Sequence, residues 1–230
     1  MRHVPTTDHY RRPSDLPPEI PVFPLRGAIL LPRASLPLNI FEPRYLQMVD
    51  DAMSGSRVIG IIQPAGGPED EESPFGKHFD LRSVGCVGRI TSYQELDDGR
   101  FVITLTGIAR FQITDEIASQ KPYRRMRVSY DRFGQDFEAG RGETAVDRDA
   151  LLSVLKKYLE ANSLRADWSS ILRASSEVLI NALSVMSPYG PEEKQALLEA
   201  MDLKTRADVL VALAEMELAS SGDAGGGTLQ

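Results

Sequence analysis

The apolar residues of this 230-residue chain change their spacing near residue 146, and this change constrains the fold more than any other feature. Between Ile20 and about Tyr130, short β-rich runs are broken by Pro and Gly. Such runs predict the strands of a small barrel or sandwich. After residue 146, apolar residues recur every three or four positions, which predicts amphipathic helices. Because strands and helices are segregated, the sequence predicts an α+β fold with two subdomains.

Six runs in the first part are expected to form strands: Val22–Leu31, Ser35–Ile40, Val58–Ile62, Val84–Tyr93, Phe101–Thr106 and Met126–Tyr130. Asp98-Gly99 separates the fourth run from the fifth and predicts a hairpin, because Gly supplies the positive φ that a tight turn needs. One helix is expected among these strands. It begins near Pro43, whose missing N–H costs nothing at a helix start, and it ends at Gly55.

Four helices are expected in the second part of the chain. One apolar stripe runs from Leu151 to Leu159 and a second from Ile171 to Met186. Pro191 begins a third helix, and Asp202 is expected to cap the fourth. The predicted organisation is therefore a flexible arm (1–18), a β-barrel subdomain (19–132), a polar, Gly-rich linker (133–146), a helical-bundle subdomain (147–219) and a flexible tail (220–230).

Charge and cysteine content exclude several classes of function. The chain has 33 acidic and 26 basic residues, so its net charge of −7 is unfavourable for a general nucleic-acid or membrane-surface binder. Its single cysteine, Cys86, excludes an internal disulfide framework and is typical of a reducing cytoplasm. No run approaches the roughly 18 apolar residues of a membrane span. We therefore expect a cytoplasmic protein without a membrane partner.

No pattern for catalysis or cofactor binding is found. The nearest match to a phosphate-binding loop is Gly76-Lys77-His78, where Glu71 replaces the first Gly and His78 the hydroxyl residue. The histidines are scattered, and no Ser-Lys pair or metal-binding spacing occurs. Cys86 lies between valines in a predicted strand, where burial makes a thiol inert. The sequence predicts no enzyme, no cofactor and no metal site.

One basic concentration allows an alternative function. Its arginines, with aromatic residues beside them, can contact single-stranded RNA by charge and stacking: Arg124, Arg125, Arg127 and Arg132. The other interpretation is a solvated strand face whose arginines pair with acids such as Asp131 and Asp136. The residue pattern and the net charge favour the second interpretation.

An ordered set of segments resembles the N-terminal, substrate-binding domain of Lon proteases, in the form seen in stand-alone members of that family. The segments are Pro21–Arg26, Phe41–Tyr45, Val84–Ile90, Leu105–Phe111 and Glu193–Glu199, followed by Arg206. The resemblance spans about residues 20–219. It implies a PUA-like β pseudo-barrel followed by a C-terminal helical bundle.

In full-length Lon, this region helps to recognise unfolded or tagged proteins. The resemblance therefore implies a non-catalytic protein-binding module whose partners are unfolded or specific proteins, among them an intact Lon protease or its substrates. The chain ends where the family's ATPase would begin, so unfolding and proteolysis are not expected. We expect Phe41, Arg44 and Tyr45 to lie near a binding groove between barrel and bundle. The alternative is that Phe41 and Tyr45 only attach the helix to the barrel and that Arg44 pairs with a neighbouring acid. The alternative is an RNA-binding PUA-like domain, and nucleic acid is the less favoured partner.

Overall fold

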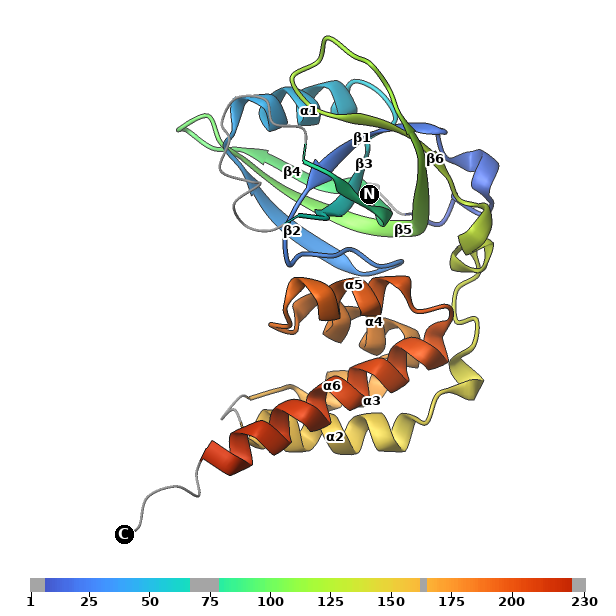
Figure 1. Cartoon of the computed structure of the whole chain (residues 1–230), viewed down its shortest axis with the longest axis vertical. Coiled ribbons are helices and arrows are strands. Elements are labelled where there is room, and N and C mark those ends of the chain that lie inside the picture. The colour runs from blue at the N-terminus through green and yellow to red at the C-terminus, as the bar shows by residue number, and fades with distance from the viewer. Residues whose placement is uncertain (1–6, 67–78, 162–164, 225–230) are drawn as a thin grey trace.

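The two spacings of apolar residues correspond to two layers, a β barrel and a set of helices on one side of it (Figure 1). The computed structural model describes residues 7–66, 79–161 and 165–224. The strands are β1 (Glu19–Pro24), β2 (Ser35–Ile40), β3 (Val58–Pro64), β4 (Leu81–Glu95), β5 (Phe101–Glu116) and β6 (Arg125–Ser129). The α-helices are α1 (Pro43–Met53), α2 (Arg148–Ala161), α3 (Trp168–Arg173), α4 (Ser176–Met186), α5 (Pro191–Glu199) and α6 (Leu203–Ala224).

Strand pairing closes the sheet into a ring. The order is β2-β5-β4-β3-β1-β6, and β6 also pairs with β5. β1 and β3 are parallel, whereas β5 is antiparallel to β2 along its first half and to β6 along its second. Register shifts in β4 and β5 bend these long strands, as β-bulges do. The predicted α+β fold, a β pseudo-barrel followed by helices, is confirmed.

The predicted hairpin joins β4 to β5, and Gly99 has the positive φ of 81° that the turn requires. The expected strand Val22–Leu31 is wrong beyond Pro24. Residues 25–34 instead form a loop that buries Leu30 and Leu31 in the core. A short apolar run has the same appearance in a strand and in a buried loop, which explains the difference.

The helices differ from their predicted bounds in two places. The stripe from Ile171 to Met186 belongs to two helices, because the side chain of Ser175 accepts a hydrogen bond from the Val178 N–H and begins α4 there. α6 continues to Ala224, so residues 220–224 are helical where composition predicts a flexible tail. Residues 225–230 of the expected tail lie outside the described residues. No helix in the described part of the chain is both long and apolar enough to cross a membrane.

The expected arm and linker contain more structure than their composition predicts. In the arm, η1 (Pro13–Asp15) is a 3-10 helix, and the Leu16 side chain that follows it is buried. Residues 1–6 of the arm are not described. In the linker region, η3 (Asp131–Phe137) and η4 (Glu143–Ala145) are 3-10 helices, and Phe133 is buried. The division of the chain into subdomains stays a prediction.

Barrel and helices share one hydrophobic core. A single cluster of buried side chains runs from Phe23 and Ile59 in the barrel, through Leu30 and Leu31, to Leu155 and other residues of the helices. A second cluster, which includes Phe111, Met126 and Val128, fills the space between β1, β5 and β6. Because the larger cluster is continuous, the helices cannot separate from the barrel without exposing apolar surface to water.

A buried ion pair crosses the same junction. Arg110 of β5 is 1% exposed, and its Nη2 and Nε donate to the two Asp136 carboxylate oxygens at 2.8 and 2.9 Å. Its Nη1 donates to the carbonyls of Leu198 and Ala200 at the end of α5. The guanidinium thus satisfies carbonyls that the helix end leaves without an intrahelical partner. Asp136 lies in η3, so one side chain links the barrel, the connecting segment and the helices.

Gly107 provides the first testable feature. A Cβ atom at this position would overlap the carbonyl group of Leu31, while the Gly107 N–H and C=O bind Ala34 and Arg33. We expect Gly107→Ala to lower the free energy of unfolding by about 1–3 kcal/mol, because the loop must move away from β5. Urea unfolding measures this. Gly134→Ala is the matched control, because nothing lies within 4 Å of its Cβ position and its φ is not positive. Equal effects of the two changes would contradict the steric argument.

The reactivity of Cys86 is the second testable feature. Its side chain is fully buried in β4, and burial raises the pKa of the thiol above its ordinary value. We expect no reaction with Ellman's reagent at pH 8 in the native protein and one thiol per chain in guanidinium chloride. A Ser56→Cys variant is the positive control, because Ser56 is exposed in a turn. Rapid labelling of the wild-type thiol without denaturant would contradict the assignment.

Candidate functional site

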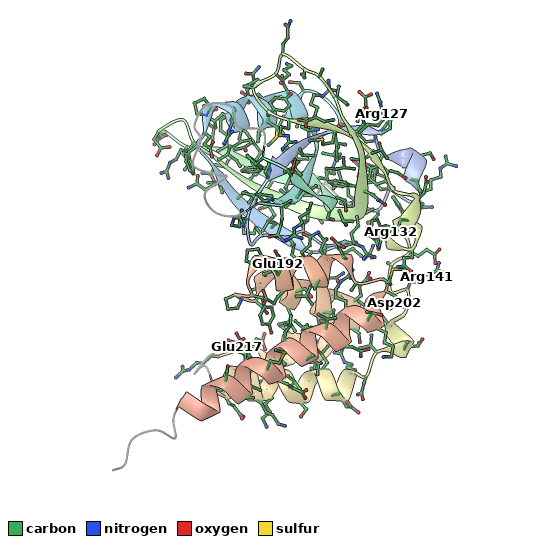
Figure 2. All side chains as sticks on the ribbon, in the orientation of Figure 1. Arg127, Arg132, Arg141, Glu192, Asp202 and Glu217 are labelled. Atoms are coloured by element: carbon green, nitrogen blue, oxygen red, sulfur yellow. The ribbon has the colours of Figure 1, made fainter. Side chains whose placement is uncertain are left out.

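An apolar groove lies between α2, α4 and α6. Its volume of about 390 Å³ falls within the range of roughly 300–1,000 Å³ that ligand pockets occupy. The walls are mostly aliphatic: Leu151, Val154, Leu155, Leu159, Leu183, Leu210, Val211 and Ala214, with Met186 and Pro188 beside them. Polar groups are few and comprise Tyr158, Tyr189, Ser187 and Glu217. Glu217 lies on the half of α6 that is remote from the barrel (Figure 2).

The groove follows from the spacing of side chains on its helices. On α6, Leu210, Ala214 and Glu217 are three to four residues apart and share one face. The methyl group of Ala214 fills little of the space opposite α2. α4 ends at Met186, because Ser187 has an extended backbone (φ −62°, ψ 142°) and Pro188 cannot continue a helix. The chain therefore turns there and places Tyr189 in the groove wall.

The groove combines an exposed apolar side chain with a few hydrogen-bonding groups. Met186 is 78% exposed, and its unbranched thioether adapts to different partners. The Tyr158 hydroxyl lies 3.5 Å from the Glu217 carboxylate. Burial raises the pKa of Tyr189 to about 12, so this hydroxyl keeps its proton at neutral pH and can donate to an acceptor. This arrangement suits noncovalent binding of apolar side chains.

The three residues that the sequence predicts for protein binding differ in their surroundings. Tyr45 is buried, and its ring centroid lies 4.2 Å from that of Phe23. Arg44 pairs with Glu42 at 2.7 Å between Nη2 and Oε2. Phe41 is 64% exposed. Tyr45 and Arg44 thus have the structural roles that the sequence left open. α1 lies across the barrel from the helices, so these residues are not near a groove between barrel and bundle (Figure 1).

Three arginines of the basic concentration are paired with carboxylates. Arg124 donates through Nε and Nη2 to both carboxylate oxygens of Glu116 at 2.8 and 2.7 Å. Arg127 lies 3.0 Å from Glu19 and 3.6 Å from Asp115, and Arg125 also lies 3.6 Å from Glu19. This agrees with the interpretation of a paired strand face.

The prediction of which acids pair with these arginines was wrong. The fourth arginine lies apart from the other three. Asp136 binds Arg110 instead, and Asp131 accepts a hydrogen bond from Ser129. Arg132 lies near the junction with the helices, at a distance from Arg127 on the barrel (Figure 2). The partners missed were acids on other strands, whose proximity depends on strand pairing. The four arginines therefore do not form one continuous basic stripe.

Other candidates for chemistry give no site in the described residues. Gly76-Lys77-His78, the nearest match to a phosphate-binding loop, and His3 lie outside them. Within the described ranges, no three His, Cys, Asp or Glu side chains are grouped so that they could hold a metal ion. The apolar groove was not predicted from the sequence. The apolar stripes of α2 and α6 indicate which faces of these helices are apolar. The spacing of residues alone does not reveal which part of such a face the other helices leave uncovered.

Comparison with known proteins identifies the family. The sequence model of the family described as ATP-dependent protease La (LON) substrate-binding domain matches residues 19–215. Lon protease of Flavobacterium johnsoniae is 26% identical over 206 residues, which are 89% of this chain and 25% of that protein. Lon protease 2 of Myxococcus xanthus is 27% identical over 208 residues, 86% of this chain and 24% of that protein. The chain thus spans about a quarter of the length of these relatives.

Solved structures agree with the fold. A Lon N-terminal domain protein from Xanthomonas campestris has a TM-score of 0.59 and 21% identity, over 84% of this chain and 97% of that one. The N-terminal domain of Mycobacterium avium complex Lon protease has a TM-score of 0.62 and 18% identity, over 86% of this chain and 98% of that one. Since the family match covers most of the chain, the chain belongs to the Lon substrate-binding domain family.

Proposed function

We propose that this chain binds exposed apolar segments of unfolded polypeptides in the groove between α2, α4 and α6, and that it does so without catalysis. The observation that carries the proposal is the groove itself, with its aliphatic walls and the exposed Met186 beside them. Its polypeptide partners are substrates of a Lon protease, or an intact Lon protease itself. The family is named for substrate binding, and the proposal assigns that function to this chain.

The chemistry of the groove favours a polypeptide over other ligands. Burial of the aliphatic side chains of an unfolded segment against these apolar walls favours binding by about 25 cal/mol per Å² removed from water. The Tyr158 and Tyr189 hydroxyls and the Glu217 carboxylate can bind the polar backbone that accompanies such side chains. Methionine on the rim allows segments of different sequence to fit, as in other binders of low specificity.

A second contact is proposed at Phe41, with Arg44 beside it. Phe41 directly follows β2, whose residues pair with the first half of β5, and Val102 in that half is also partly exposed. Its large exposed ring suits apolar contact with a partner. Tyr45 supports this surface from within the core.

The RNA-binding alternative is weaker. Arg124, Arg125 and Arg127 already lie near carboxylates, and an RNA phosphate would have to displace those partners. The net charge of −7 adds long-range repulsion.

The central prediction concerns binding to labelled, reduced and carboxymethylated α-lactalbumin, which cannot refold. Met186→Gln combined with Leu159→Gln should weaken the Kd by at least tenfold, because burial of one such side chain contributes roughly 1.5–3 kcal/mol. Met201→Gln is the matched control, since Met201 is 63% exposed but lies outside the groove. Fluorescence anisotropy measures the Kd of the double variant and of the control. In the same assay, Phe41→Ser tests the second contact. Equal weakening by Met201→Gln would remove the groove from the proposal.

A salt titration separates protein binding from RNA binding. Affinity for the unfolded protein should change little between 50 and 500 mM salt, because burial of apolar area is not screened. An RNA site built on Arg124, Arg125 and Arg127 would instead show a log–log slope of roughly −2, because each phosphate contact on a single strand contributes about −0.7. Tight RNA binding with that slope, abolished by Arg125→Ala and Arg127→Ala, would replace the proposed function.

The purified chain should neither hydrolyse ATP nor degrade casein, since neither a complete phosphate-binding loop nor an activated nucleophile is found in its sequence. Phosphate release and fluorescent-casein assays measure these activities. ATP-stimulated cleavage that co-purifies with the chain through several columns and is lost with its removal would contradict the non-catalytic assignment.

A further inference from the structure

A charged cavity lies where the barrel meets the helices. Its volume is about 340 Å³, which falls within the range of roughly 300–1,000 Å³ that ligand pockets occupy. Its lining includes four buried charged residues, Arg110, Asp136, Glu177 and Arg206, and the side chain of Arg33, which is 25% exposed. Arg141 and Asp202, which also line it, lie at this junction (Figure 2). This cavity is separate from the apolar groove, since the two share no lining residue.

The charges of these five residues do not balance. Arg110 is paired with Asp136, and Arg33 is paired with Glu177. Arg206 is 3% exposed, and among the described residues no carboxylate forms an ion pair with it. Three guanidinium groups thus face two carboxylates, which leaves one positive charge without a partner.

The hydrogen bonds of Arg206 involve only neutral groups. Its Nε donates to the Leu197 carbonyl at 2.9 Å, and its Nη1 donates to the Asn181 Oδ1 at 2.8 Å. Its Nη2 is buried and has no partner among the described residues, and the same holds for the Nε of Arg33. Both side chains line the cavity. An unsatisfied buried donor is costly, and more so when it carries charge.

The charges at the mouth of the cavity compensate for this only in part, because Asp202 is attracted to Arg206 but forms no ion pair with it. Arg141 pairs with Glu138 at 2.7 Å, and Lys204 pairs with Asp208 at 2.5 Å. The Asp202 Oδ1 accepts from the Thr205 N–H, as an N-cap does. Burial, followed by repulsion from Arg110, lowers the pKa of Arg206 to about 9, so the group still carries its charge at pH 7.

We propose that this cavity binds a small oxyanion, a phosphate or a carboxylate group, through the free N–H groups of Arg206 and Arg33. Guanidinium N–H groups suit oxyanion oxygens in geometry and charge. One negative charge would balance the buried cluster. The lining residues come from the barrel, η3, α4 and α6, so a bound anion would hold these elements together.

The test uses the full chain with sodium phosphate and sodium acetate as probes and sodium chloride at matched ionic strength as the reference. Amide chemical shifts should change saturably near residues 33, 136–142 and 202–206. At about ten times the Kd, the Tm should rise by roughly 3–6 °C over the chloride reference. A response to phosphate alone or to acetate alone assigns the oxyanion class. No saturable response to either, or shifts confined to the Arg124–Arg127 segment, would overturn the proposal.

Three variants locate the site. Arg206→Gln and Arg33→Gln should each weaken binding at least tenfold, because each removes a charged donor. Arg132→Gln removes a cation near the junction that does not line the cavity, and it should leave the Kd unchanged. If Arg206→Gln fails to fold, Arg33→Gln and the wild-type shift map decide. A folded Arg206→Gln or Arg33→Gln chain that keeps the wild-type Kd would exclude the site.

Discussion

The buried pair of Arg110 and Asp136 is the interaction on which the arrangement of barrel and helices depends. Removing one partner of such a pair typically costs about 3–5 kcal/mol, because the other charge is left buried. Here the cost also has a geometric consequence. Arg110 binds the carbonyls of Leu198 and Ala200, where α5 turns into α6. The position of α6, and with it the wall of the apolar groove, is therefore set from a strand of the barrel.

Much of the fold was predictable because local chemistry and tertiary structure agree there. The turn at Asp98-Gly99 needs a positive φ, and Gly99 has it. The helix at Pro43 buries Tyr45, Met48 and Val49 on the face that their spacing defines. The loop at residues 25–34 was not predictable in the same way. Its apolar run is buried because Gly107 lets the backbone approach β5 closely, and this contact joins residues more than seventy positions apart.

The candidate sites were less predictable, for a related reason. Sequence spacing identifies an apolar face but not the part of it that neighbouring helices leave uncovered, so the groove beside Met186 could not be inferred from stripes. Likewise, the partners of Arg124 and Arg127 are Glu116 and Glu19, which only strand pairing brings near. Charge concentration along the chain therefore overstated the free positive charge of this region. The unpaired charge of Arg206 gave no sequence signal, because it results from which carboxylates are already occupied.

The two cavities are lined by successive parts of one helix, α6. Near its start, α6 is fixed by Arg206, which binds the Leu197 carbonyl and Asn181, and Asn181 in turn donates to the Pro32 carbonyl of the barrel loop. Eight residues later, at about 1.5 Å per residue, Ala214 lies in the wall of the apolar groove. A helix transmits the position of its first turns along its axis, so contacts at the junction hold the groove in shape before any partner binds. A preformed groove loses less entropy on binding than one that must be ordered by its ligand. If the groove binds polypeptide as proposed, the polar junction contributes to that recognition by keeping α6 in place, although it contributes no surface to the groove.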